Sequence, residues 1–296
     1  MGSVPAAVFA AMPAAVHAEL DRRGIRLAQV AEVVDLRPDE VLLLAGSYAT
    51  GEANPTSDLD LLVLSVESGS RAPAGSSNHP SIFGDSYDIT LADLTVNVEY
   101  VPQSRFLELC DMVAAARSAP AGPEIGNFQA LELRLAQRAV TGIALVGAEL
   151  LDSLRRRLHF ETVRSSAAAL SFVMTMSLLE DTRVLDPPGQ LLMLRGAGEL
   201  LVMAALNAVG PITYDIKHLF PRSARLAAEP AAPSALRDAE QLVFIDRLPV
   251  DEGVSLVLDH AQDLYRRLAA DPVHREIIEM LQPFLAGWSW TDRVFD

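Results

Sequence analysis

Hydrophobic residues in the first hundred positions come in short runs that end at glycine, proline or acidic residues. One run, VLLLA, spans residues 41 to 45 and ends at Gly46-Ser47. A second run, LDLLVL, spans residues 59 to 64 and begins directly after Asp58. Short apolar runs bounded by turn residues are typical of buried β-strands. The pattern therefore predicts two strands, with a tight turn at the end of the first.

Residues 87 to 102, YDITLADLTVNVEYVP, alternate between apolar and polar side chains. This period of two predicts two further strands, joined near Ala92-Asp93. The second of these strands carries Asn97 and Glu99 two positions apart. Their side chains are therefore expected to project from the same face of the sheet.

Helical spacing of three and four residues marks most of the remaining chain. Residues 4 to 34 predict a helical region before the first strand, and the Ser-, Gly- and Pro-rich residues 66 to 86 predict a loop. From Gln103 onward the pattern is helical almost to the end. Clear amphipathic segments are residues 130 to 141 and 147 to 158, and breaks are predicted at residues 186 to 189, 210 to 211 and 227 to 235.

Strands followed by helices predict an α+β fold. We expect residues 1 to 150 to form a domain with a small mixed sheet flanked by helices, and residues 151 to 296 to form an all-α domain. A chain of 296 residues, 50% of them hydrophobic, is long enough for two cores. The apolar segment 189 to 210 is interrupted by Arg195 and Glu199, so we expect a buried domain helix there and no membrane-spanning run.

Asp58 and Asp60 flank Leu59 and should therefore project from the same face of their strand. Two ionised carboxylates side by side repel each other unless a cation lies between them. Mg²⁺ commonly takes one or two carboxylates together with water and substrate phosphates. Gly46 lets the backbone approach a phosphate closely, and Ser47 adds a hydroxyl and an N–H donor. These residues together predict a metal-dependent nucleotide site.

The stretch GSYATGEANPTSDLDLLV resembles the signature of the DNA polymerase β-like nucleotidyltransferase superfamily. It is similar to the form found in aminoglycoside adenylyltransferases and minimal nucleotidyltransferases, where Gly-Ser, ten residues and Asp-x-Asp follow one another, and Gly51 matches as well. The resemblance implies a polymerase β-like catalytic domain followed by a helical companion. It also implies transfer of a nucleoside monophosphate, with Mg²⁺ (two ions) as the cofactor and ATP as the expected donor.

This family carries a third carboxylate on a following strand, between apolar residues. Glu99, within VEY, has such neighbours, and we expect it to complete the catalytic and metal-binding set with Asp58 and Asp60. Its implied role is to bind a second metal ion or to remove the proton of the acceptor hydroxyl. Asp88 is the competing candidate, but it starts its run beside a Ser/Gly/Pro-rich loop, where a solvated Asp is ordinary.

The same resemblance implies that Gly46, Ser47 and Ser57 bind the nucleotide. The interval between Gly-Ser and Asp-x-Asp lacks the arginines common in the minimal group, so the triphosphate charge must be met elsewhere. Lys217, the single lysine of the chain, follows a predicted helix break, and we expect it to contact the triphosphate. An accident of composition is the competing interpretation.

The sequence says less about the molecule that accepts the nucleoside monophosphate. The long helical half favours a hydroxyl of a small molecule, such as an aminoglycoside-like or other natural product, and hence a role in antibiotic resistance. Adenylylation of a protein or RNA, as in antitoxin-like minimal nucleotidyltransferases, is the alternative. A catalytically degenerate nucleotide-binding module is a third interpretation, which the presence of three candidate carboxylates argues against.

Net charge and cysteine content narrow the class of protein further. The net charge of −15 argues against nonspecific nucleic-acid binding and is compatible with a cationic acceptor. The single cysteine, Cys110, excludes an internal disulfide, and the N-terminus lacks the basic start of a secretory signal. We expect a cytoplasmic protein with no membrane association, and the sequence leaves the oligomeric state open.

Overall fold

The structure of the protein is a computed structural model with two compact units. It describes residues 2–3, 6–66, 75–80, 85–118, 128, 130–214, 216–272, 274–275, 279, 288–290 and 293–294. Residues 1–112 and 135–160 form the first unit, and residues 113–134 and 161–296 form the second. Residue 150, where the sequence predicts the domain junction, lies within helix α6 (Ala148–Leu158), which packs on strands of the first unit.

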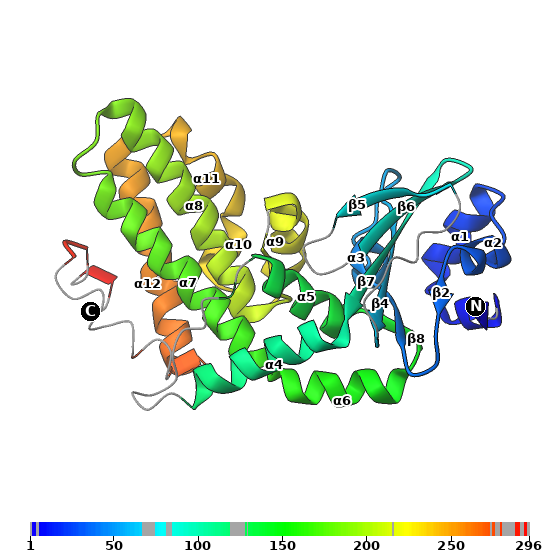
Figure 1. Cartoon of the computed structure of the whole chain (residues 1–296). Helices are drawn as coiled ribbons and strands as arrows, with labels where there is room; N and C mark the ends of the chain where they lie inside the picture. Colours follow the sequence, from blue (N-terminus) through cyan, green and yellow to red (C-terminus); the bar gives the residue numbers. More distant parts are fainter. Residues whose placement is uncertain are drawn as a thin grey trace. The chain divides into compact units, whose positions relative to one another are not determined.

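The first unit is built on a mixed sheet in which the described strands follow the order β5-β6-β7-β4-β3-β8 (Figure 1). Strand β4 runs parallel to β7, and the other neighbouring pairs are antiparallel. A separate short pair joins Gly2–Ser3 (β1) to Asp35–Leu36 (β2). The strands of the mixed sheet are Val41–Leu44 (β3), Leu59–Ser65 (β4), Ser77–Pro80 (β5), Asp85–Leu91 (β6), Leu94–Pro102 (β7) and Ile143–Val146 (β8).

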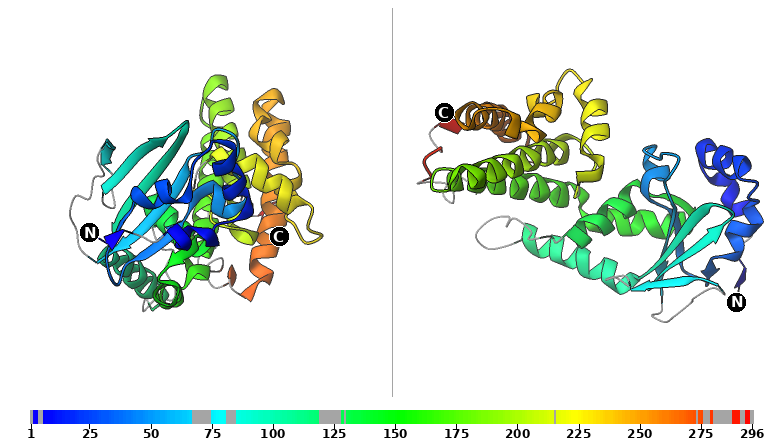
Figure 2. Two further views of the ribbon diagram at one scale, coloured as in Figure 1. Left: turned by 90° about the vertical axis from the view of Figure 1, so that its right-hand side faces the viewer. Right: turned by 90° about the horizontal axis from the view of Figure 1, so that it is seen from above.

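One face of this sheet is apolar and is covered by the N-terminal helices η1 (Ala6–Ala11), α1 (Ala14–Arg22) and α2 (Leu27–Glu32), drawn in blue in Figures 1 and 2. Leu59, Leu61 and Val63 of β4 belong to this core and are almost fully buried. Alternation along a strand then places Asp60 on the opposite face. The predicted apolar face of Leu59, Leu61 and Val63 is confirmed. The opposite face carries Asp60 together with the buried Leu62 and Leu64, and Asp58 lies just before the strand.

The remaining helices of the first part of the chain are α3 (Gly46–Thr50), α4 (Gln103–Arg117), α5 (Ala130–Thr141) and α6. The start of α4 at Gln103 and the bounds of α5 agree with the predicted helical segments. Arg155 of α6 donates to the carbonyl oxygens of Ala139 (2.9 Å) and Gly142 (2.6 Å) at the end of α5. These bonds satisfy backbone acceptors that a helix leaves unpaired at its C-terminus, so α6 fixes the position of the last turn of α5.

The described residues of the second unit form helices only. Asp186 caps helix α8 by accepting a hydrogen bond from the Gly189 N–H at 3.1 Å, which explains why the predicted break at 186 to 189 begins a helix. Figure 2 shows α8 alongside α12. The helices are α7 (Phe160–Asp181), α8 (Pro187–Val209), η2 (Ile216–His218), α9 (Leu219–Ala227), α10 (Ser234–Arg237), α11 (Ala239–Val243), η3 (Ile245–Arg247) and α12 (Val250–Ala270).

Helix α8 lies unusually close to α11. A Cβ atom built on Gly198 would approach the carbonyl oxygen of Leu242 to 2.0 Å, so this position accepts glycine alone without a shift of the backbone. Leu194, Leu201 and the neighbouring apolar residues of α8 are fully buried in the core of the unit. The architecture as a whole is α+β, as the sequence predicts.

Three expectations need correction. Residues 66 to 86 are not all loop, because β5 and the start of β6 fall within them, while residues 67–74 and 81–84 lie outside the described residues. Strand β8 interrupts the predicted helical series. Helices α7 and α8 are long and apolar enough to cross a membrane by length and composition, contrary to expectation, although 61% and 56% of their apolar windows are buried.

Candidate active site

The turn after β3 brings Gly46 against Asp60. The Ala45 N–H donates to the Asp60 carbonyl oxygen at 2.9 Å, which joins the end of β3 to the start of β4. Gly46 has φ +64, and a Cβ atom built on it would lie 1.9 Å from Asp60 Oδ2. The turn therefore needs glycine for two reasons, the left-handed backbone and the closeness of this carboxylate. The Gly-Ser turn and the Asp-x-Asp strand form one contiguous structure, as the sequence predicts.

Asp58 stands at the exposed start of β4, and a hydrogen-bonded loop leads into it. Ser57 Oγ accepts from the Asn54 N–H at 2.9 Å, and the Ser57 N–H donates back to the Asn54 carbonyl oxygen at 2.9 Å. Arg23 of α1 donates to the Pro55 carbonyl oxygen at 3.0 Å from its Nη2. Ser57, predicted to bind nucleotide, thus has its hydroxyl engaged within the loop that positions Asp58.

Arg23 is itself held by acidic neighbours. Its Nε donates to Glu19 at 2.6 Å, and its guanidinium pairs with Asp93 at 3.0 Å. Hydrogen bonds from Arg22 and Arg23 lower the pKa of Glu19 to about 2. Burial raises the pKa of Tyr48, and the negative charges of Glu19 and Asp58 act in the same direction. Tyr48 therefore stays a neutral, buried phenol on α3, next to the acidic side of the site.

Asp60 and Glu99 share one arginine. Arg138 Nη2 donates to Asp60 Oδ1 at 3.0 Å, and Arg138 Nη1 donates to Glu99 Oε2. The side chain of Asp60 is 22% exposed, that of Arg138 11% and that of Glu99 3%, so burial increases from Asp60 to Glu99. Charge-assisted hydrogen bonds of this kind are strong and directional. Arg138 thereby joins two of the three predicted catalytic carboxylates.

The register of the sheet places further polar residues, Asn97 and Asp88, in line with Asp60 across strands β4, β7 and β6. Asn97 of β7 stands opposite Asp60 of β4 and opposite Asp88 of β6. The Asn97 amide donates to Asp88 Oδ1 at 2.7 Å and to Ser86 Oγ at 2.8 Å. Asp88 is therefore bonded to the strand next to it, whereas Glu99 is bonded to the arginine that contacts Asp60. This geometry associates Glu99, more than Asp88, with the Asp-x-Asp strand.

Two of the predicted nucleotide-binding residues lie at different places in the chain. Ser47 is the second residue of α3, directly after Gly46, and its side chain is partly exposed. Lys217 is an exposed residue of η2 in the second unit. The predicted contacts of both with a triphosphate stay predictions.

Asp58, directly before β4, and Asp60, within it, are the carboxylates that would hold a hard divalent cation, which takes one or two carboxylates together with phosphate oxygens and water. Asp60 directs Oδ2 toward Gly46 while its Oδ1 accepts from Arg138. Within the part of the chain that the structure describes, no group of three or more His, Cys, Asp and Glu side chains is placed to hold a metal ion. Glu99 is bonded to Arg138 instead, so a second ion at Glu99 requires Arg138 to release that carboxylate.

Sequence reasoning missed Arg138. It lies in the amphipathic segment 130 to 141, where a single arginine in a helical pattern is normally a surface residue. One signal was present in the sequence, since Arg138 and Gln137 stand between the apolar residues Leu135, Ala136 and Ala139; in the structure all five are buried. A charged residue on the buried side of a helix requires a partner of opposite charge.

Comparison with known proteins identifies a segment of the chain that is similar to a known family. Residues 28–109 match the family model of the nucleotidyltransferase domain, and this segment contains Gly46, Ser47, Asp58, Asp60 and Glu99. A solved structure of a nucleotidyltransferase-like protein from Exiguobacterium sibiricum 255-15 is 15% identical, with a TM-score of 0.40, over 82% of this chain and 73% of that one. No curated protein matches the sequence.

Proposed function

From the premise that residues 28–109 form a nucleotidyltransferase domain, which makes the chain a transferase, we propose the following reaction. The protein transfers AMP from ATP to a hydroxyl group of a small molecule and releases pyrophosphate. The acceptor oxygen attacks the α-phosphorus of the triphosphate, and the bond between the α-phosphorus and the bridging oxygen to the β-phosphate breaks. The proposed site residues are Gly46, Ser47, Asp58 and Asp60, with Glu99 and Arg138 behind them.

The observation that carries this proposal is the contact of Gly46 with Asp60. The backbone of the turn and the carboxylate are so close that an added Cβ would lie 1.9 Å from Oδ2. A phosphate that approaches the Gly46-Ser47 backbone therefore also approaches Asp60 and its neighbour Asp58. Magnesium held by Asp58 and Asp60 would neutralise triphosphate charge and orient the α-phosphate. Positioning and electrostatic stabilisation supply most of the catalysis in phosphoryl-type transfers.

Arg138 has the role of a positioning residue in this proposal. It fixes the orientation of the Asp60 carboxylate by one hydrogen bond and is itself anchored by buried Glu99. Asp60 Oδ2 remains directed toward the Gly46 turn. Glu99 acts through Arg138 as long as this ion pair persists. A role as second metal ligand or as base for the acceptor hydroxyl requires the pair to open.

Two features support the proposed acceptor of the nucleoside monophosphate: the helical second unit and the net charge of the chain. The helical unit is comparable in size to the first and has its own core, which suits a substrate-binding domain. The net charge of −15 disfavours RNA and suits a cationic natural product such as an aminoglycoside-like compound. We therefore propose a resistance-type reaction in the cytoplasm, with a protein or RNA acceptor as the alternative.

The test is a screen with α-phosphate-labelled ATP, GTP, CTP and UTP in the presence of Mg²⁺. Aminoglycosides, lincosamides and a cell extract serve as acceptors in parallel reactions. Label on a low-mass species, with ATP as the best donor, is the expected result. Label on a protein or RNA band would replace the small-molecule acceptor by the alternative, and label from another nucleotide alone would correct the donor.

A further inference from the structure

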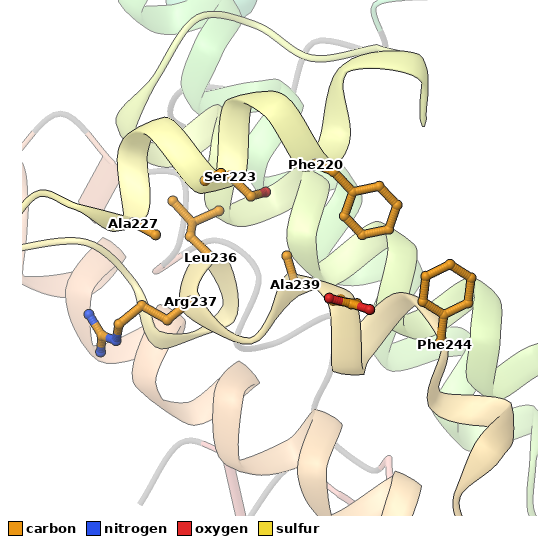
Figure 3. Close-up of a pocket in the computed structure, with 9 residues that line it drawn as sticks. Phe220, Ser223, Ala227, Leu236, Arg237, Ala239 and Phe244 are labelled. Carbon is orange, nitrogen blue, oxygen red and sulfur yellow. The ribbon is translucent and has the colours of Figure 1, made fainter.

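A pocket in the second unit contains none of the residues assigned to the proposed reaction. It has a volume of about 420 Å³ and lies among α9, α10 and α11 (Figure 3). Its apolar lining includes Phe220, Phe244, Leu236 and Ala239, and its polar lining is Ser223, Arg237 and Glu240. This volume is within the range of small-molecule sites, which are concave, mostly apolar and carry a few polar groups.

Two aromatic rings form one wall of the pocket. Phe220 and Phe244 are stacked, with ring centroids 5.8 Å apart and an interplanar angle of 11° (Figure 3). Phe220 is 40% exposed, which is unusual because aromatic side chains are mostly buried in folded proteins. The Arg247 guanidinium lies 4.6 Å from the centroid of Phe244. A cation already occupies one aromatic face here, and such faces attract cations because of their quadrupole.

Ser223 adds a polar group that has no partner of its own. Ser223 is 2% exposed, and its Oγ makes no hydrogen bond within the part of the chain that the structure describes. In Figure 3 this hydroxyl points toward the side of the pocket that carries Phe220. An unpartnered buried hydroxyl destabilises the folded protein, so a native site retains it where a ligand supplies the missing hydrogen bond.

Glu240 gives the pocket an available negative charge. The contacts of the nearby guanidinium groups are to neutral partners, since Arg237 donates to the Ala232 carbonyl oxygen at 3.0 Å and Arg247 lies over Phe244. Asp238 lies 3.4 Å from His260. The described residues offer Glu240 no ion pair, although it lines this pocket and an adjoining one of about 400 Å³. A carboxylate beside aromatic rings is the combination that recognises an organic cation.

We propose that this pocket binds a small organic cation, in which an aromatic or other apolar group carries a protonated amine. The apolar group lies against Phe220 and Phe244. The ammonium donates hydrogen bonds to the Glu240 carboxylate and to Ser223 Oγ. This inference goes beyond the proposed transfer reaction, because it assigns a second ligand site whose occupancy needs neither nucleotide nor magnesium.

The test is isothermal titration calorimetry of the full chain with three probes of equal shape and different charge. They are 2-naphthylmethylamine, 2-naphthalenemethanol and 2-naphthoate, titrated without nucleotide or metal. The amine is expected to bind with a Kd on the order of 1 mM or tighter, and about tenfold more tightly than the naphthoate. Binding of the naphthoate as tightly as the amine, or no binding of the amine, would overturn the proposal.

Three variants locate the binding of the amine. Phe220→Leu keeps an apolar surface but removes the ring and is expected to weaken binding about tenfold, and Glu240→Gln about three- to fivefold. Ser223→Ala is expected to weaken binding while raising the Tm of the free protein, because it removes a buried unpartnered hydroxyl. Glu252→Gln, an exposed change on α12 outside the pocket, is the control and leaves the Kd unchanged. Equal Kd values for all four variants would overturn the assignment.

Discussion

At the scale of single residues, the candidate active site depends on the ion pairs of Arg138 with Asp60 and Glu99. One guanidinium contacts two carboxylates, and the side chain of the more buried one, Glu99, is 3% exposed. Removing one partner of a buried ion pair leaves a charge that neither water nor protein neutralises. Stability and positioning at this site therefore depend on the same side chain.

Arg138→Met is expected to destabilise the first unit by about 3–5 kcal/mol, because Glu99 becomes an unpaired buried charge. The double variant Arg138→Met/Glu99→Gln removes both charges and should recover most of this loss. Urea unfolding gives the free energies. Arg105→Met, which breaks an exposed pair with Glu108, is the control and should change stability by less than about 1 kcal/mol. A double variant as unstable as Arg138→Met would show that the buried charge is not the cause.

The Gly46 turn supplies a second residue-scale prediction, with Gly51 as its matched control. Both glycines have a positive φ, so an alanine at either position costs about 1–2 kcal/mol of backbone strain. A Cβ at Gly46 collides with Asp60, whereas a Cβ at Gly51 meets nothing within 4 Å. Gly46→Ala should therefore abolish binding of Mg-ATP in equilibrium titrations, and Gly51→Ala should retain it. Equal nucleotide affinity in the two variants would contradict a role for this turn.

Sequence analysis named the carboxylates and the turn of the candidate site and missed Arg138, which joins Asp60 to Glu99. Gly46, Asp58 and Asp60 are readable because strand alternation and turn chemistry act over a few residues. Arg138 is 78 positions from Asp60 and 39 from Glu99, so only the packing of α5 on the sheet reveals the contact. The polar group nearest to it in the chain, Gln137, keeps an unbonded Oε1 among the described residues.

At the scale of elements, His274 joins the chain after α12 to α7 and α8. His274 Nε2 lies 3.1 Å from the Ala208 carbonyl oxygen, which only accepts, so Nε2 carries the proton. Nδ1 of the neutral ring then accepts from Ser165 Oγ at 2.7 Å. Burial lowers the pKa of His274, and the positive charge of Arg164 lowers it further. The negative charges of Asp271 and Glu161 raise this pKa but do not outweigh the burial. Burial likewise lowers the pKa of His260.

These histidines predict that the second unit loses stability in mild acid. Their folded-state pKa values lie below the unfolded value of about 6.5, so the unfolded chain binds protons first as the pH falls. Their contribution is fully present above about pH 6.5 and declines below it, by at most about 1.4 kcal/mol per pH unit for each histidine. Urea unfolding of wild type and His274→Gln from pH 7.5 to 5.5 measures the slope. His274→Gln should have a shallower slope than wild type, and identical slopes for the two proteins would refute the assignment.

The elements themselves were largely predictable where one segment controls its own structure. The bounds of α5 and the strands β3, β4 and β7 follow directly from periodicity. Strand β8 escaped prediction because its four residues become a strand only by pairing with β3 at the edge of the sheet. Strand β5 escaped for the same reason, since it pairs with β6 from within a Ser/Gly/Pro-rich segment.

The whole molecule combines two units with separate cores. The first unit contains the candidate carboxylates and the segment, residues 28–109, that matches the model of the nucleotidyltransferase domain, and the second unit contains the aromatic pocket of Phe220 and Phe244. The order of the predicted elements indicated this general plan, because strands precede helices along the chain. The acceptor stays a proposal, since residues that recognise an acceptor share no fixed spacing in the sequence.

The central claim is that Asp58 and Asp60 at the Gly46 turn perform Mg-dependent nucleotidyl transfer. The most direct measurement is transfer of α-phosphate label from ATP by Asp58→Asn, Asp60→Asn and Asp88→Asn, with the acceptor found for the wild type. The first two variants should lose at least about 100-fold in rate, because an amide does not replace the charge of a metal-binding carboxylate. Asp88→Asn keeps its acceptor oxygen toward Asn97 and should transfer label at nearly the wild-type rate. Full activity of Asp58→Asn and Asp60→Asn, or loss confined to Asp88→Asn, would contradict the account.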